Sequence, residues 1–121
     1  QVTAADELED CALRILTTVV SRPTEDRAIL DAGSKTLSSD TLGLHGHGHV
    51  VEYPQLDLVR LSEEHGHVDC RDSELRPRIG ERVTLIPNHA CVVTNLHDIV
   101  YGVRGRRVER IFRVEARGRV Q

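Results

Sequence analysis

The protein has 121 residues, enough for one domain with a buried core but few for a complete metabolic enzyme. Its 16 basic and 19 acidic residues give a net charge of −3, which favours neither nucleic acid nor an anionic membrane as a partner. Cys11, Cys70 and Cys91 are an odd count without the spacing of a disulfide framework. No apolar run approaches the ~20 residues of a spanning helix, and no signal sequence is recognisable. We therefore expect a cytoplasmic protein. Because the sequence starts at Gln1 and contains no methionine, we also expect a piece of a longer polypeptide.

The first half of the chain predicts strands joined by polar turns. Residues 12–21 are rich in β-branched side chains, and Arg22-Pro23 ends that run. Residues 27–32 alternate between apolar and other side chains up to Gly33, so the two segments predict an antiparallel hairpin. Residues 33–49 read as a long loop, functional or partly mobile. Strand patterns return at 50–53 and 56–61, with Pro54 between them.

The second half continues the same organisation. Residues 62–69 are a polar segment, and 71–81 are a charged surface connection to a strand at 83–86. One or two helical turns are expected in 92–97, with Asn88 as N-cap. A closing hairpin pairs 99–103 with a half-buried strand at 108–116, in which Val108, Phe112 and Val114 share a face with the alanine at 116. We expect an all-β fold: one distorted antiparallel barrel or sandwich with one or two short helical turns.

His89 and Cys91 follow the predicted strand 83–86 at a spacing of two residues. In an extended segment such side chains point to the same face, so an imidazole and a thiolate can converge on one metal ion. Two ligands are too few for a closed structural zinc site, and open positions suit a catalytic metal. The alternative is a buried, unreactive Cys91 beside a surface histidine.

Two further groups carry chemistry-bearing side chains. The tract His45-Gly46-His47-Gly48-His49 is a possible metal cluster, but its glycines leave the backbone unfixed and favour a flexible polar loop. Glu63, Glu64, His65 and His67 suit acid–base work or support of a metal ligand, and they equally suit a solvated turn.

Four segments, taken in order, resemble one known family. They are Asp-Ala-Gly-Ser-Lys at 31–35, Leu-Ser-Glu-Glu-His-Gly at 61–66, Pro-Asn-His-Ala-Cys at 87–91, and Tyr-Gly-Val-Arg-Gly at 101–105 with Ala-Arg-Gly at 116–118. From about Asp10 onward, the chain resembles the C-terminal domain of the D-serine dehydratase and D-threonine aldolase family. These are metal-activated pyridoxal phosphate enzymes related in fold to alanine racemase.

The resemblance implies that residues 1–121 are a single C-terminal β domain. The N-terminal α/β barrel, with the lysine that holds pyridoxal phosphate, is absent from this chain, and Lys35 does not inherit that role. A His and a Cys or Asp two residues apart hold a divalent ion in the family, and these positions match His89 and Cys91. The thiolate favours zinc, with manganese or magnesium as alternatives. Glu64 and His65 match the motif that approaches the same site.

The implied reaction begins at the β-hydroxyl of a D-amino acid, which the metal polarises as a Lewis acid. Dehydration and retro-aldol cleavage both remain open. The full-length protein is expected to be a homodimer, and the isolated domain is expected to be inactive. Two alternatives stay in view: a stand-alone metal-binding or scaffold β domain, and an alanine-racemase-like domain with a tyrosine base. Tyr53 and Tyr101 are the only tyrosines, and neither has a recognisable context for that base.

Overall fold

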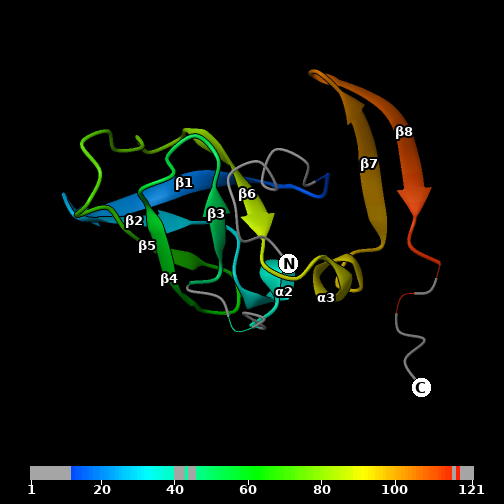
Figure 1. Ribbon diagram of the computed structural model, residues 1–121, viewed down its shortest axis with the longest axis horizontal. Helices are drawn as coiled ribbons and strands as arrows, with labels where there is room; N and C mark the ends of the chain where they lie inside the picture. Colours follow the sequence, from blue (N-terminus) through cyan, green and yellow to red (C-terminus); the bar gives the residue numbers. More distant parts are fainter. Residues whose placement is uncertain (1–11, 40–42, 44–45, 116, 118–121) are drawn as a thin grey trace.

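A six-stranded antiparallel sheet, curled into a nearly closed barrel, forms the body of the protein (Figure 1). The computed structural model describes residues 12–39, 43, 46–115 and 117. The strands are β1 (Ile15–Thr24), β2 (Arg27–Leu30), β3 (Gly48–Val50), β4 (Asp57–Leu61), β5 (Gly66–Asp69), β6 (Arg82–Pro87), β7 (Ile99–Arg104) and β8 (Arg107–Arg113), and the helices are α2 (Ser34–Leu37) and α3 (Ala90–Thr94). The expectation of an all-β, distorted antiparallel barrel with short helical turns is confirmed.

The long strand β1 organises the barrel. The strand order is β3-β6-β1-β2-β5-β4, and every neighbouring pair is antiparallel. The first half of β1 pairs with β6 and its second half with β2, in a register that shifts on either side of Ser21. Such irregularities bend a strand, and bending lets a sheet curl. The two ends of the sheet meet where the His47 amide donates to the Leu58 carbonyl at 3.0 Å.

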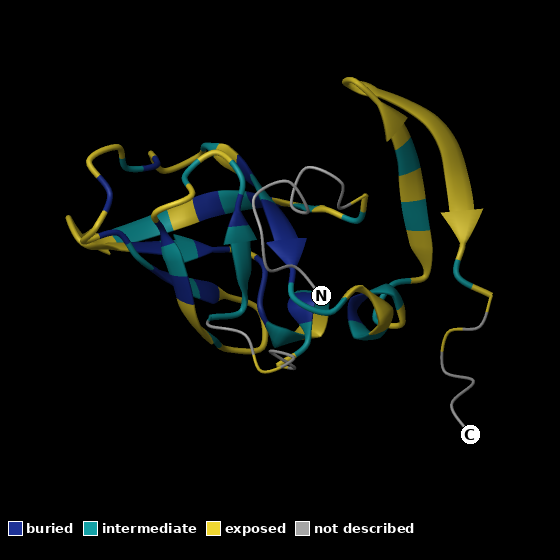
Figure 2. Ribbon diagram, in the orientation of Figure 1, coloured by how far each residue is buried: buried dark blue, intermediate teal, exposed yellow. Residues whose placement is uncertain are grey.

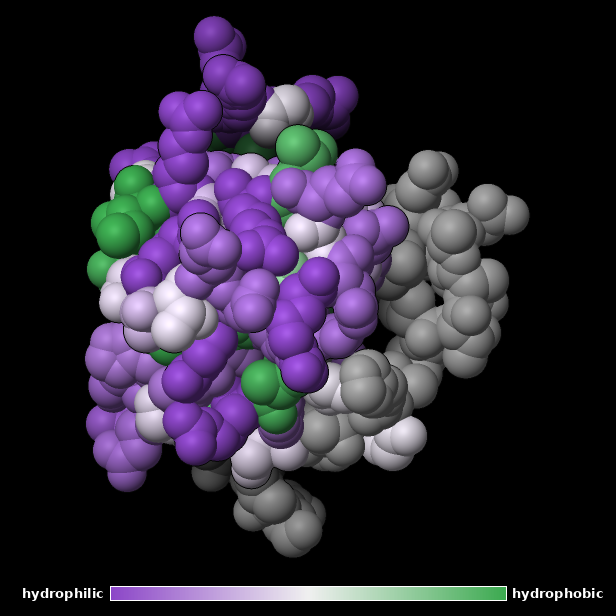
Figure 3. Space-filling model, turned by 90° about the vertical axis from the view of Figure 1, so that its left-hand side faces the viewer, coloured by the Kyte–Doolittle hydropathy of each residue, from purple (hydrophilic) through white to green (hydrophobic). Residues whose placement is uncertain are grey.

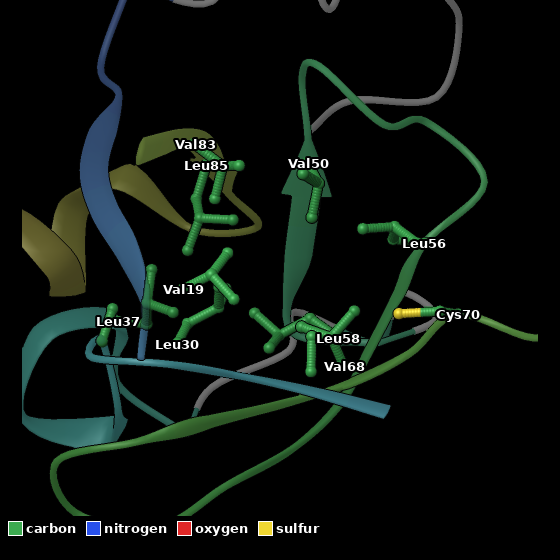
Figure 4. Close-up of a cluster of buried hydrophobic side chains, with 12 residues drawn as sticks. Val19, Leu30, Leu37, Val50, Leu56, Leu58, Val68, Cys70, Val83 and Leu85 are labelled. Carbon is green, nitrogen blue, oxygen red and sulfur yellow. The ribbon is translucent and has the colours of Figure 1, made fainter. Parts of the chain in front are cut away.

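Aliphatic side chains from all six strands fill the barrel, and α2 adds one more (Figure 4). The strands follow the period-two rule, in which alternate residues point inward. Val83 and Leu85 of β6, for example, are fully buried. Each such side chain contributes about 1.5–3 kcal/mol. The largest buried members are the leucines Leu30, Leu37, Leu56, Leu58 and Leu85.

Two segments that were predicted as loop or polar connection contain regular structure. The segment 62–69 includes β5, where Gly66 and Val68 point into the barrel while His67 and Asp69 point outward. The segment 33–49 includes α2 and the start of β3. Both predictions are wrong at these residues because each element is only three or four residues long and buries one or two of them, which gives too weak an apolar pattern to detect.

Several element boundaries also differ from those predicted. The first strand begins at Ile15 and continues through Pro23 to Thr24. β3 ends at Val50, so residues 51–53 are not a strand. α3 begins at Ala90, two residues before the predicted helix, and its N-cap is His89 instead of Asn88.

The strands β7 and β8 form a separate hairpin that projects from the barrel (Figure 1). The predicted hairpin is confirmed, but the predicted half-burial of its second strand is wrong, since every residue of β8 is exposed (Figure 2). The pairing shifts by one residue after Gly102, so Val108 lies opposite Val103 and Phe112 lies opposite Val100. Val108 and Phe112 therefore lie on opposite faces, which the sequence alternation did not predict.

One face of this hairpin is apolar and uncovered in the structure. Its side chains are between 40% and 65% exposed. We call this set the apolar face of the hairpin: Ile99, Tyr101, Val103, Val108 and Ile111.

Candidate functional site

The His89 and Cys91 pair spans the start of α3, directly after β6. His89 has the extended angles φ −135° and ψ 99°, and its carbonyl accepts from the Val93 amide at 3.4 Å. Cys91 is already inside α3, and it is an exposed free thiol. His89 and Cys91 therefore do not lie on one face of an extended segment, as the sequence predicted. His89 is the last extended residue, and Cys91 lies in the first turn of α3, in which the Val93 side chain is buried.

The described part of the histidine-glycine tract lies beside this connection. In the ladder of β3 and β6, Gly48 pairs with Pro87 and His49 pairs with Ile86. The Asn88 side-chain amide donates to the Gly46 carbonyl at 2.9 Å, which extends the contact to the residue before His89. The flexible-loop interpretation is thus wrong for Gly48 and His49, which belong to β3, and His45 lies outside the described residues.

Both described histidines of the tract are partly buried. Desolvation lowers the pKa of His49, because a buried imidazole accepts a proton less readily. The Nδ1 atom of His47 is buried and has no hydrogen-bond partner among the described residues. Neither histidine forms a group of three or more His, Cys, Asp or Glu side chains able to hold a metal in the described part of the chain.

Glu64 and His65 lie on the turn between β4 and β5, and both are exposed. The turn is fastened to the start of α2: the Ser34 amide donates to the Ser62 carbonyl at 2.8 Å, and the Lys35 amide donates to the Glu63 carbonyl at 3.1 Å. The structure thus brings together the two segments 31–35 and 61–66, which are 25 or more residues apart in the sequence.

Gly33 and Lys35 make this contact possible. A Cβ atom at Gly33 would collide with the backbone of the turn, within 2.5 Å of the Glu63 carbonyl oxygen and the His65 nitrogen. The Lys35 ammonium lies 2.9 Å from a carboxylate oxygen of Glu64, and this hydrogen bond raises the pKa of Lys35. The local sequence around Lys35 gives no sign of the glutamate that it meets, because Glu64 is distant along the chain.

Asp31 secures the start of the same segment against β1. Its carboxylate accepts from the Thr17 hydroxyl at 2.5 Å and from the Thr18 amide at 2.9 Å. The hydroxyl donor of Thr17, acting against partial desolvation, holds the pKa of Asp31 below its usual value. The residue is thus a structural anchor.

The two candidate groups lie at the same end of the barrel. A ring nitrogen of His97, just after α3, is 3.1 Å from the Thr36 carbonyl oxygen in α2, so α2 and α3 are linked (Figure 1). The start of α2 thus contacts the turn of Glu64 and His65, and Thr36 of the same helix contacts His97, which follows α3. Within residues 12–39, 43, 46–115 and 117 no three metal-ligating side chains converge.

The tyrosines lie in different surroundings. The Tyr53 hydroxyl donates to a Glu81 carboxylate oxygen at 2.7 Å, and this bond raises the pKa of Tyr53. Tyr101 belongs to the apolar face of the hairpin.

Among the described residues, no helix has both the length and the apolar character needed to cross a membrane.

The fold and the site together define a small antiparallel β-barrel domain with a His–Cys pair at one end. Residues 12–103 match the family model described as "putative serine dehydratase domain", and the chain belongs to this family. It is 36% identical to a D-threonine aldolase of an Arthrobacter species over 88% of this chain and 27% of that protein. It is also 38% identical to an uncharacterised protein of Mycobacterium tuberculosis, over 91% of this chain and 86% of that protein.

Solved structures agree with this assignment. The D-threonine aldolase of Filomicrobium marinum superposes with a TM-score of 0.77 at 35% identity, over 89% of this chain and 29% of that one. The D-threo-3-hydroxyaspartate dehydratase of a Delftia species superposes with a TM-score of 0.67 at 27% identity, over 77% of this chain and 29% of that one. Two further solved structures of a D-threo-3-hydroxyaspartate dehydratase are of variants in which a histidine and a cysteine two residues apart are replaced by alanine, and the structure of the cysteine variant is of a metal-free form. The chain spans between a quarter and a third of the length of these enzymes and most of the mycobacterial relative.

Proposed function

We propose that this chain is the C-terminal β domain of a pyridoxal phosphate-dependent lyase that acts on β-hydroxy D-amino acids. In this proposal the domain contributes His89 and Cys91 to a divalent metal. The observation that carries it is the pair itself: a member of this family presents a histidine and a free, exposed cysteine two residues apart. The metal-free form of the related dehydratase, in which a cysteine at the same spacing is replaced, supports it.

The donor set fits such a metal. Cys91 is exposed, and His89 is half-buried at the end of the strand that precedes it. A thiolate beside an imidazole favours zinc over magnesium because both donors are comparatively soft. The described residues add no third ligand, which leaves positions for water and substrate. The reduced thiol that ligation requires is in keeping with a cytoplasmic setting.

The metal, when bound, would supply Lewis acidity at the substrate β-hydroxyl, and pyridoxal phosphate would supply the electron sink. His89 and Cys91 would hold that metal and so fix the position of the substrate β-hydroxyl relative to the domain. Glu64 or His65 would accept or donate the proton that dehydration or cleavage of the carbon–carbon bond moves. Their exposure on the turn beside α2 leaves both able to exchange protons with a bound substrate.

The proposal requires a companion domain that binds pyridoxal phosphate. Lys35 is exposed and pairs with Glu63 and Glu64, so it is poorly suited to hold the cofactor. We place that lysine in an N-terminal α/β barrel of the same polypeptide, which the greater length of the aldolases supports. The apolar face of the hairpin is a surface that such a companion, or a second subunit of a dimer, would cover.

Zinc binding by the purified chain tests the metal assignment. Zinc content after dialysis should be about one ion per chain, and His89→Ala and Cys91→Ala should each lose most of it. His67→Gln is the matched histidine control, and Cys70→Ala is the cysteine control because the Cys70 thiol is buried. Equal zinc content in His89→Ala and the unmodified chain would remove His89 as a ligand.

An activity assay tests the dependence on a companion domain. The isolated 121-residue chain should show no turnover of D-threonine or D-serine with added pyridoxal phosphate and zinc, because the residue that holds the cofactor is missing. Measurable turnover would contradict the proposed division of labour.

A second candidate is a stand-alone metal-binding β domain. The observation that favours it is the mycobacterial relative, of which this chain spans 86%. The upstream coding sequence discriminates between the two, since a barrel of roughly 250 residues with a cofactor lysine is required only by the first. Both candidates predict the same zinc result at His89 and Cys91.

A further inference from the structure

An open groove of about 490 Å³ lies on the outer face of β2, β5 and β4. Three consecutive neighbours of the sheet form its floor, and the turn between β1 and β2 forms one wall. This end of the molecule is mostly hydrophilic, with apolar residues in small separate patches (Figure 3). None of the residues that line the groove belongs to β6 or α3, so the groove is distinct from the connection that carries His89 and Cys91.

The carboxylates of the groove are already paired with cations. Both oxygens of Asp69 accept from the Arg71 guanidinium, the shorter contact being 2.6 Å. Asp26 lies 3.3 Å from the guanidinium of Arg76. Both oxygens of Asp69 and one oxygen of Asp26 are therefore already engaged by arginine.

Two other arginines, Arg27 and Arg60, line the same groove. Arg27 stands opposite Asp69 in the ladder, and Arg60 stands opposite His67. Among the described residues no carboxylate oxygen lies within 4.0 Å of the Arg27 or Arg60 guanidinium. A guanidinium nitrogen of Arg60 lies 3.5 Å from His67 Nδ1. A guanidinium donates hydrogen bonds and accepts none, so Arg60 and His67 together form a donor pair when an anion is present.

The positive charges of the groove act on His67. Burial, followed by the charges of Arg60, Arg27 and His65, lowers the pKa of His67. Three cationic or protonatable groups, Arg27, Arg60 and His67, thus line one open groove, and among the described residues neither arginine has an ion-pair partner.

We infer that this groove binds the phosphoryl group of a small organic phosphate. Arg27 and Arg60 approach from strands on either side of His67, so the oxygens of one tetrahedral anion can accept from both guanidinium groups and the imidazole. Val59 lines the same groove and offers an apolar surface to the organic part. The volume is within the range of small-molecule sites. Nothing in this inference depends on the metal pair.

Titration with inorganic phosphate and with phenyl phosphate, at constant ionic strength, tests the site. The His67 ring signals in the proton NMR spectrum should shift saturably, and the pKa of His67 should rise because a bound anion favours the imidazolium. Phenyl phosphate should bind more tightly than inorganic phosphate if Val59 contributes. Arg27→Gln and Arg60→Gln should each weaken binding about tenfold.

Arg107→Gln is the matched control, since Arg107 is an exposed arginine at the start of a strand on the distant hairpin. It should leave phosphate binding unchanged. A shift that does not saturate, or one that Arg107→Gln weakens as much as Arg60→Gln, would overturn the site and indicate non-specific attraction to arginine. Phosphate binding should persist in zinc-free His89→Ala, so failure of the metal proposal would leave a separate result.

Discussion

Gly33→Ala tests the contact that joins the segments 31–35 and 61–66. The added Cβ would approach three backbone atoms, the carbonyl oxygens of Ser62 and Glu63 and the nitrogen of His65, at distances that real Cβ atoms do not show. Gly33 has φ −116°, an extended value that alanine also adopts, so the cost is steric. Overpacking costs about 1–3 kcal/mol. Because the atoms that the new Cβ meets belong to the backbone and cannot rotate away as a side chain can, we expect a loss of about 3 kcal/mol in the free energy of unfolding.

Urea unfolding followed by circular dichroism measures that cost. At a slope of about 2 kcal/mol per M, the midpoint should fall by about 1.5 M. Amide exchange of Ser34 and Lys35 should accelerate as well, since their hydrogen bonds to the turn would break. Gly80→Ala is the control: it has open space but φ +90°, so its cost should be about 1 kcal/mol and purely conformational. A loss below about 0.5 kcal/mol in Gly33→Ala would refute the proposed close contact.

Three further changes probe the core, the histidine strand and the hairpin. Leu58→Ala should cost about 3 kcal/mol in urea unfolding because the side chain is fully buried, whereas Leu75→Ala, 73% exposed, should cost less than about 0.5 kcal/mol; similar losses would contradict the assigned core. Burial lowers the pKa of His49 in the folded state, so on acidification the unfolded chain binds this proton at a higher pH than the folded chain, and the free energy of unfolding should fall as the pH decreases below about 6.5. His49→Gln should flatten this fall, and identical pH curves for the variant and the unmodified chain would contradict the role of His49. Ile111→Thr should reduce binding of an apolar dye while changing the free energy of unfolding by less than about 0.5 kcal/mol, and a larger loss would show that the apolar face of the hairpin is covered.

The parts of the fold that could be predicted were those with strong alternation. The hairpin of β1 and β2 and the strand β6 follow from runs of branched side chains. β5 could not be predicted from its four residues, because its inner face is only Gly66 and Val68 and its outer face is polar. Its strand character comes from pairing with β2 on one side and β4 on the other, which is tertiary information.

The candidate site, like the fold, could be predicted only in part from the sequence. The spacing of His89 and Cys91 marked the position, but the start of α3 between them depends on the burial of Val93. The contact of Lys35 with Glu64 joins residues 29 positions apart, and no periodicity reports such a pair. The groove of Arg27, Arg60 and His67 was missed for the same reason: its three residues are neighbours only once β2, β5 and β4 lie side by side.

The separateness of the β7–β8 hairpin has a consequence for how the chain unfolds. Its strands are hydrogen-bonded to each other and to no strand of the six-stranded sheet. A two-stranded ribbon without a covered face is marginal in water. The chain should therefore open in two steps of different free energy, the hairpin in frequent local excursions and the barrel in rare global ones. A single midpoint measured on the barrel would describe only the more stable of two cooperative units, and any partner that covers the hairpin would merge them into one.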